Sequence, residues 1–137
     1  MKRMINRIGV FHKMGHSARV SNDYRKSVNL KICLSLSEWI AKKGYCNPEC
    51  SLRSLSDDFG VAEDHLICYF QENYKGGFRR FRTDLRIELA KKLLLSMPDA
   101  PFSRIAVLVG ILDKTNFRRQ FKENVGMTPD MWRRLHR

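Results

Sequence analysis

Five polar residues between positions 114 and 119 have side chains whose chemistry suits hydrogen bonding to nucleic-acid bases. Arginine can donate two parallel hydrogen bonds to guanine, asparagine pairs well with adenine, and threonine offers both a hydroxyl and a methyl group. Phe117 and Phe121 lie four residues apart and would occupy the inner face of a helix, which leaves the polar residues exposed. A merely solvated cationic helix face is the alternative interpretation. The five residues are Lys114, Thr115, Asn116, Arg118 and Arg119.

The surrounding sequence predicts a helix-turn-helix unit over about residues 103–125. Ser103 can cap a short first helix, Gly110 permits a tight turn, and Asp113 can cap the second helix, which carries the five polar residues. The turn and the second cap would together fix where that helix begins. The expected inner residues of this unit are Ile105, Ala106, Val109, Phe117 and Phe121.

An internal repeat predicts another such unit over about residues 51–75. Ser51 can cap its first helix and Gly60 permits its turn. The repeat has a definite register, because Gln71-Glu72-Asn73-Tyr74-Lys75 matches Lys122-Glu123-Asn124-Val125-Gly126, 51 residues later. The expected inner residues are Leu52, Leu55, Phe59, Leu66, Tyr69 and Phe70.

A long helix is expected between the two units, over about residues 78–97, with Pro98 ending it. A helix of about twenty residues spans roughly 30 Å. Successive major grooves on one face of B-DNA lie about 34 Å apart. A rigid helix of this length would therefore let one chain present two recognition helices to adjacent turns of DNA.

Two further helices and a basic arm complete the expected fold. Residues 28–43 have apolar residues at three- and four-residue spacing, with Gly44 as the left-handed end, and Thr128-Pro129 begins a short final helix. Residues 1–27 are expected to form a basic linker or arm in front of a domain at 28–137. The sequence thus predicts an all-α fold of about seven helices, with two helix-turn-helix subdomains joined by a long linker helix.

The charge of the chain is uneven and points to a polyanionic partner. The 137 residues carry 26 Lys plus Arg against 14 Asp plus Glu, a net charge of +12. Residues 1–31 carry +7, residues 32–75 carry −3, and residues 76–137 carry +8. Nucleic acid is the commonest partner of such a surface. An anionic membrane surface or a solvated basic surface are the alternatives.

Patterns typical of membrane spans, secretion signals and enzymes are missing from the sequence. Its apolar runs are too short for a span, and the first eleven residues lack the core of a secretion signal, so we expect a cytoplasmic, nucleoid-associated protein without disulfides. We expect no enzyme, because no Gly-rich phosphate loop, HExxH or GxSxG motif occurs. Cys46 and Cys50 with His12 and His16 could be drawn as a zinc site, but both histidines lie in the arm, and we expect neither metal nor cofactor.

The stretch from Ser51 to Arg137 resembles the DNA-binding domain of AraC/XylS-type transcription regulators. The resemblance covers roughly the last two thirds of the chain, and the combination of motifs is quite specific. The motifs are Arg86-Ile87-Glu88-Leu89-Ala90-Lys91-Lys92-Leu93-Leu94-Leu95, Ile105-Ala106 with Val109-Gly110, Asn116-Phe117-Arg118-Arg119-Gln120-Phe121-Lys122, and Gly126-Met127-Thr128-Pro129 with Trp132-Arg133.

The resemblance implies a bacterial regulator whose seven-helix domain binds double-stranded DNA, with the second helix of each unit in the major groove. The base-reading positions of the family fall on the five polar residues of the second unit. By analogy, Ser103, Arg104 and Lys122 would bind phosphates, which fix register rather than sequence. Family members mostly activate transcription by recruiting RNA polymerase, and they commonly have an upstream sensory or dimerisation domain. We expect no such domain within these residues, which would make the chain either a short stand-alone regulator or a part of a larger one, with residues 1–27 as the remains of a linker.

The first unit departs from the family pattern. The N-cap position holds Ala62, and the outward recognition positions include the two acids Glu63 and Asp64, which phosphates would repel. We therefore expect asymmetric docking, in which the second unit reads the sequence and the first serves as a scaffold, weak reader or protein-contact surface. A degenerate domain acting as a protein-interaction adaptor is the alternative. The weak reading positions of the first unit are Asp64, His65, Ile67 and Cys68.

Overall fold

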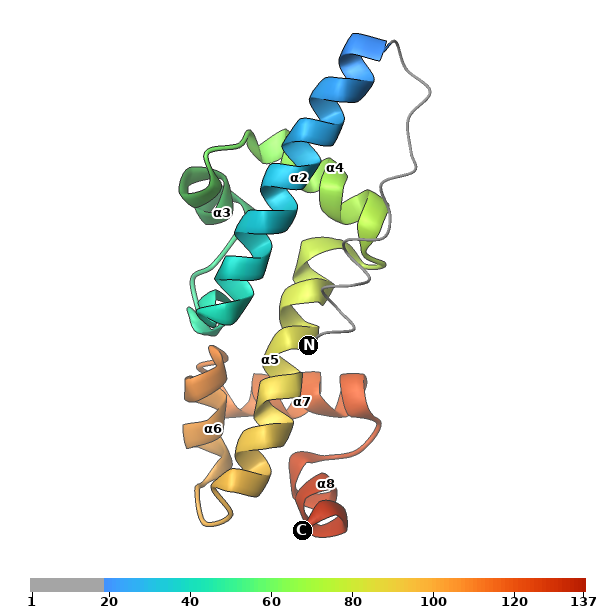
Figure 1. The fold of residues 1–137 in the computed structure, drawn as a ribbon. Coiled ribbons are helices and arrows are strands. Elements are labelled where there is room, and N and C mark those ends of the chain that lie inside the picture. Colours follow the sequence, from blue (N-terminus) through green and yellow to red (C-terminus); the bar gives the residue numbers. More distant parts are fainter. Residues whose placement is uncertain (1–18) are drawn as a thin grey trace. The chain divides into compact units, whose positions relative to one another are not determined.

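The computed structural model describes the backbone of residues 19–137 and the side chains from residue 22 onward. The regular structure of this part of the chain consists of α-helices and one short 3-10 helix (Figure 1), which confirms the predicted all-α fold. His12, His16 and most of the predicted arm lie outside the described residues. The elements are α2 (Arg19–Ala41), η1 (Gly44–Cys46), α3 (Leu52–Phe59), α4 (Glu63–Asn73), α5 (Gly77–Ser96), α6 (Phe102–Val109), α7 (Lys114–Val125) and α8 (Pro129–His136).

The chain divides into two compact units, and each has its own helix-turn-helix pair. Unit 1 contains α2, α3, α4 and the first residues of α5, as far as Phe81. Unit 2 contains the rest of α5 from Arg82 together with α6, α7 and α8, and also the short segment Tyr45–Glu49. The predicted linker helix is thus the 20-residue helix α5, which contributes to both units.

A cluster of aromatic rings forms part of the core of unit 1. The ring of Phe70 on α4 lies 5.2 Å from the rings of both Phe78 and Phe81 on α5, and Tyr74 lies 5.1 Å from Phe81. Trp39 of α2 stacks on Phe81 at 6.5 Å. Ring pairs at these distances stabilise the fold by more than the burial of their apolar surface alone. This cluster joins α2, α4 and the start of α5.

The core of unit 2 is built where α6, α7 and α8 pack around the second half of α5 (Figure 1). Phe121 of α7 contacts Phe117 at 6.0 Å and Trp132 of α8 at 6.3 Å. The fully buried face of α7 is therefore fixed by its two phenylalanines. The core residues are Ile87, Ala90, Leu94, Ile105, Ala106, Val109, Ile111, Phe117, Phe121 and Trp132.

Helix α2 begins nine residues earlier than predicted, at Arg19 rather than Val28. Its first turns have few apolar residues, so their sequence gives no helical periodicity. They are held by contacts with α4 instead: Arg25 forms a 2.7 Å ion pair with Glu72, and the ring of Tyr24 lies edge-on to His65 at 5.8 Å. Extending an existing helix needs little further stabilisation, because the unfavourable step is nucleation.

Two predicted helix ends were wrong in detail. The residue with left-handed conformation after α2 is Lys43 (φ 57°), not Gly44. Glycine is required at position 44 for space, because a Cβ there would overlap the indole of Trp39. The N-cap of α6 is Pro101, so Ser103 lies inside the first turn of α6 instead of capping it. The earlier start lets Phe102 pack against the core of unit 2.

Candidate nucleic-acid interface

The start of α7 is fixed by a side-chain cap. Asp113 accepts hydrogen bonds through Oδ1 from the backbone N–H groups of Thr115 at 2.8 Å and Asn116 at 3.3 Å. Gly110, with φ +94°, ends α6 and allows the turn that leads to this cap. Both features confirm the prediction from sequence. A carboxylate at this position also suits the positive end of the helix dipole.

The five predicted base-reading residues lie on the side of α7 that faces away from the core. Phe117 and Phe121 are completely buried. Lys114, Thr115, Arg118 and Arg119 are exposed and Asn116 is half-buried, so the structure brings all of them onto the solvent-facing side of one helix. This exposure is necessary for entry into a groove.

Half-buried Asn116 and exposed Arg119 and Glu123 form a connected group on α7. Arg119 donates from Nη2 to Oδ1 of Asn116, and its Nη1 lies 3.3 Å from Oε1 of Glu123. The residues are spaced i, i+3 and i+7, so they lie one above another along the helix. Sequence reasoning named Asn116 and Arg119 separately and did not include Glu123.

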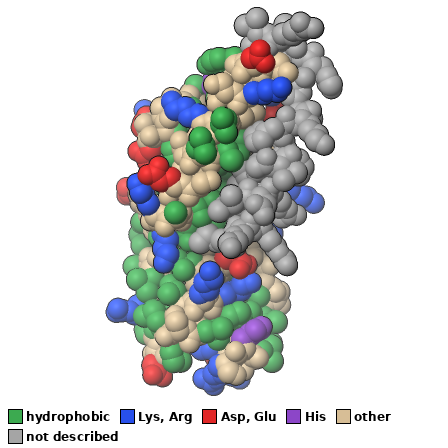
Figure 2. Space-filling model, viewed as in Figure 1, with side chains coloured by type: hydrophobic (Ala, Val, Ile, Leu, Met, Phe, Trp, Pro, Cys, Tyr) green, Lys and Arg blue, Asp and Glu red, His purple; other side chains and the backbone are tan. Residues whose placement is uncertain are grey.

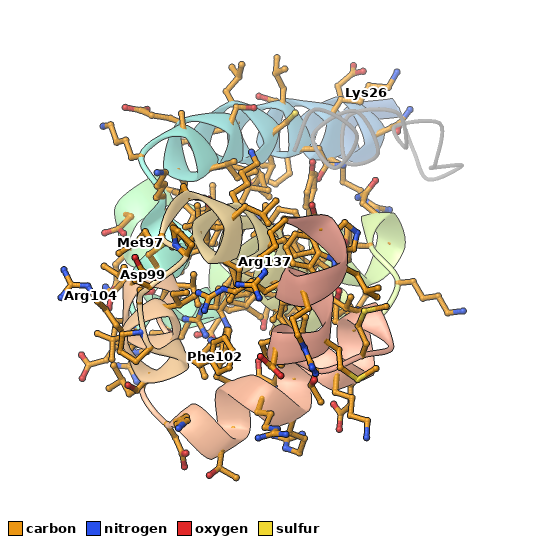
Figure 3. All side chains as sticks on the ribbon, turned by 90° about the horizontal axis from the view of Figure 1, so that it is seen from below. Lys26, Met97, Asp99, Phe102, Arg104 and Arg137 are labelled. Atoms are coloured by element: carbon orange, nitrogen blue, oxygen red, sulfur yellow. The ribbon has the colours of Figure 1, made fainter. Side chains whose placement is uncertain are left out.

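The residues expected to bind phosphate lie at both ends of the helix pair in unit 2. Ser103 and Arg104 are exposed in the first turn of α6, and Arg104 points away from that helix (Figure 3). Lys122 is exposed in the last turn of α7. Figure 2 shows Lys and Arg side chains on the surface of unit 2 with hydrophobic groups between them.

The recognition helix of unit 1 is different in both its cap and its charge. Ala62 has no side-chain acceptor to offer as a cap, and the first turn of α4 contains Glu63 and Asp64. Asp64 and Cys68 are exposed and Ile67 is half-buried. Further acidic side chains lie on the neighbouring helix α3 (Figure 2), where both Asp57 and Asp58 are exposed. This face is poorly suited to a phosphate backbone.

His65, the fourth weak reading position of unit 1, points toward α2. Its ring lies 5.8 Å from that of Tyr24, and the ion pair between Arg25 and Glu72 lies two helical turns further along the same side of α4. Helix α2 thus covers the side of α4 on which His65 lies. Sequence reasoning placed this residue between the exposed positions and did not anticipate the contact.

Exposed cations at the start of α5 were not singled out from the sequence. Lys75, Arg79 and Arg80 are all exposed, and they surround Gly76 and Gly77, which have positive φ angles. A count of charges around this glycine pair would have found them. They are the main cationic group of unit 1 near the end of its recognition helix.

Two arginines of the basic C-terminal half are buried and do not contribute to a DNA-binding surface. Arg86 donates from Nε to the carbonyl oxygen of Tyr45 at 2.7 Å and from Nη2 to that of Asn47 at 2.9 Å. Arg133 donates to the carbonyl oxygens of Leu94, Met97 and Ala100. Charge counted along the sequence therefore overstates the exposed charge of unit 2.

The described residues can also be compared with what metal binding and membrane spanning require. Within them, no cluster of three or more His, Cys, Asp or Glu side chains is arranged to hold a metal ion. Cys46 is half-buried and Cys50 is buried, and neither forms a disulfide. None of the helices in residues 19–137 combines the length and the apolar character needed to cross a bilayer.

Two helix-turn-helix pairs and an exposed polar recognition helix define this chain as a DNA-binding domain. A family model described as a helix-turn-helix domain matches residues 55–135. The chain belongs to this family, the AraC-type helix-turn-helix proteins, and it is a DNA-binding transcription regulator domain.

Similar proteins agree with this assignment. An uncharacterized HTH-type transcriptional regulator from Staphylococcus aureus is 37% identical over 83 residues, which are 61% of this chain and 11% of the relative. The chain thus matches only about a tenth of the length of the curated relatives. The C-terminal domain of AraT, a response regulator from Geobacillus stearothermophilus, has a TM-score of 0.69 at 25% identity and covers 77% of this chain and 85% of its own. The C-terminal domain of the response regulator yesN from Fusobacterium nucleatum has a TM-score of 0.63 at 28% identity, over 72% of this chain and 97% of its own.

Proposed function

We propose that this chain binds double-stranded DNA sequence-specifically through α7, with unit 2 as the main reader. The observation that carries the proposal is the capped helix α7, whose buried phenylalanines leave four polar side chains exposed and Asn116 half-buried on the side away from the core. Ser103, Arg104 and Lys122 flank this face and would bind phosphates, which set the register of the helix in the groove.

Unit 1 contributes less to sequence reading in this proposal. The first turn of α4 is acidic and uncapped, and α2 covers the side that carries His65. Asp64 is the residue of α4 best suited to a base, since a carboxylate can accept a hydrogen bond from cytosine N4. The acidic face of α3 and α4 also favours a second candidate function, an adaptor that binds a basic protein surface.

Activation of transcription through contact with RNA polymerase, in the cytoplasm, belongs to the same proposal and is supported by the resemblance to AraC-type regulators. An upstream sensory or dimerisation domain would be a further partner. A promoter-reporter assay with wild type and an α7 variant tests the sign of regulation. Reporter output that rises with wild type and not with the variant supports activation, and output that falls contradicts it.

The experiment that tests DNA reading is selection of bound sites from a random duplex library near physiological salt. Wild type is compared with Arg118→Ala/Arg119→Ala, and with Arg79→Ala/Arg80→Ala as a control that removes the same charge at the start of α5. We expect a motif that the α7 variant loses and the control retains. A motif lost equally in both variants contradicts α7 as the main reader.

Salt dependence separates DNA binding from the adaptor function. Neutralising roughly six to ten phosphates lowers affinity by about three to five decades between about 50 and 200 mM salt. Two results together would favour the adaptor function. The duplex library would give no enriched motif, and the affinity for DNA would not fall steeply with salt.

A further inference from the structure

The inference concerns a small hollow in unit 2, beside the start of the recognition helix α7. The hollow has a volume of about 260 Å³, and its walls come from the beginnings of α6, α7 and α8. Three of the side chains that form it are apolar, and two cations of α7 lie beside them. The lining residues that matter here are Phe102, Phe117, Pro129, Lys114, Arg118 and Asp130.

The apolar walls of the hollow are held in place by the core of unit 2. Phe117 is completely buried, and Phe102 is half-buried and packs against the same core. The side chain of Phe102 points inward from the start of α6 (Figure 3), and its ring centre lies 5.0 Å from the guanidinium carbon of Arg133. Pro129 is buried at the first position of α8 and has no N–H group. The hollow therefore has a fixed apolar surface.

The polar side chains at the hollow are exposed or already engaged. Lys114 and Arg118 are exposed and lie one turn apart on α7. The hydroxyl oxygen of Thr128 accepts a backbone N–H in the first turn of α8 at 3.3 Å, and the carboxylate of Asp130 pairs with Arg134 at 3.0 Å. The hollow thus suits an apolar group in its interior, with a negatively charged partner close to the two cations.

DNA presents few apolar groups that could enter such a hollow. The base edges in the major groove consist mainly of hydrogen-bond donors and acceptors, and the apolar group among them is the C5-methyl of thymine. A recognition helix contacts base edges chiefly with the residues near its N-terminus. Lys114 is the first residue of α7, so the hollow lies beside the part of the helix that is expected at the base edges.

We propose that this hollow receives the C5-methyl group of a thymine, so that unit 2 selects thymine at one position of its DNA site. The inference rests on the proposed function, because α7 must lie in the major groove, and it deepens that function by naming a base. Contact between the methyl group and the hollow removes apolar surface of both partners from water. Lys114 and Arg118 supply positive charge that holds the DNA against this surface.

The first test replaces thymine by uracil, one position at a time, in the duplex that selection from the random library identifies. Uracil lacks only the C5-methyl group and keeps the other major-groove atoms of thymine. We expect one thymine at which the replacement weakens binding of wild type roughly fourfold, the effect of about one buried methyl group. Competition titration in low salt measures each ratio of affinities, because weakened complexes still form there.

The second test assigns that methyl group to the hollow with protein variants. Phe102→Leu shortens one apolar wall, and Val107→Ala is the control, because Val107 is exposed on α6 outside the hollow. We expect the preference for thymine over uracil to disappear largely in Phe102→Leu and to persist in Val107→Ala. The measured quantity is a ratio of two affinities for one protein sample, so a partly unfolded variant still gives a valid result.

Two results would overturn the inference. One is a selected site in which uracil replaces every thymine without loss of affinity. The other is a thymine preference that persists in Phe102→Leu; if it then disappears in Thr115→Ser, which keeps the hydroxyl and loses the methyl, Thr115 contacts the thymine instead. A wild type without any selected motif would contradict the proposed function itself, which keeps the two failures distinguishable.

Discussion

Gly110 lies against the backbone of Cys46, so closely that a Cβ at position 110 would be 2.6 Å from the carbonyl oxygen of Cys46. This contact brings the turn between α6 and α7 against the short segment Tyr45–Glu49 within unit 2. Gly126 has nearly the same φ, +91° against +94°. Among the described residues, however, no heavy atom outside Gly126 and its two chain neighbours lies within 4 Å of where a Cβ on Gly126 would be.

Comparing substitutions at these two glycines separates two effects on stability: the strain of a positive φ angle, and the steric overlap of a Cβ with its neighbours. Gly126→Ala should lower the free energy of unfolding by about 1 kcal/mol, the cost of a left-handed alanine. Gly110→Ala should lower it by roughly 2 kcal/mol more, because a backbone atom must move. Urea unfolding of both variants measures the difference. Equal losses would show that the turn moves away from Cys46 freely.

The missing cap of α4 offers a stabilising change. Ala62→Ser should raise the free energy of unfolding by about 1 kcal/mol, because Ala62 already has the extended conformation of an N-cap (φ −63°, ψ 142°) and a serine oxygen can accept from the first turn. Asp113→Ala is the reverse case and should cost about 1 kcal/mol. Thermal unfolding monitored by circular dichroism checks both signs. If Ala62→Ser were no more stable than wild type, the serine side chain would not reach the free N–H groups in the first turn of α4.

Arg133 is predicted to be essential to the connection between α5 and α6. Its guanidinium binds the carbonyl oxygens of Leu94, Met97 and Ala100 at 2.9–3.2 Å and lies 5.0 Å above the ring of Phe102. Arg133→Met removes the guanidinium donor from these carbonyls, of which Met97 keeps the N–H of Ala100, and should cost about 2–3 kcal/mol.

Arg134 provides the control for this change. It is exposed and pairs with Asp130 at 3.0 Å, so Arg134→Met should cost less than about 0.5 kcal/mol. Chemical unfolding of the two variants gives the comparison. Similar losses would contradict a specific role for Arg133.

Stability should fall in alkaline solution because of buried tyrosines. Burial raises the pKa of Tyr45 to about 12, and burial together with Cys33 raises the pKa of Tyr69 as well. The folded state therefore favours the protonated phenol. This stabilisation is complete below the unfolded pKa of about 10 and is lost as the pH rises from there toward the folded pKa.

The free energy of unfolding should be measured at a series of pH values. The series runs from neutral pH to about pH 12, which is the pKa of Tyr45 in the folded state. Tyr45→Phe should have a flatter decline than wild type above the ordinary tyrosine pKa of about 10. Parallel curves for the two proteins would mean that Tyr45 ionises in the folded state as readily as in the unfolded chain.

Much of the fold follows from local sequence signals. The caps at Ser51, Asp113 and Thr128 occur where they were predicted, because a cap depends only on a side chain and the N–H groups two or three residues later. Helical periodicity likewise depends on neighbours within two turns. The same rules failed at Ser103 and Gly44, where packing against Phe102 and Trp39 decides the outcome.

Some features of the candidate site could likewise be predicted from the sequence, and others could not. The exposed face of α7 follows from the spacing of Phe117 and Phe121, so its five polar residues could be named from sequence. The connection of Asn116 with Arg119 and Glu123 depends on rotamers, which spacing permits but does not select. The exposure of His65 depends on α2, whose first turns have no sequence periodicity to predict them.

The sequence by itself determined most of each helix, the caps at Ser51, Asp113 and Thr128, the internal repeat and the uneven charge, since each of these depends on residues close together in the chain or on composition. The tertiary structure decided which charges are available. Arg86 and Arg133 bind carbonyl oxygens about forty positions away in the chain, and Arg25 pairs with Glu72 across a separation of 47. A buried charge must be hydrogen-bonded, and the partners that make this possible come together only when the helices pack.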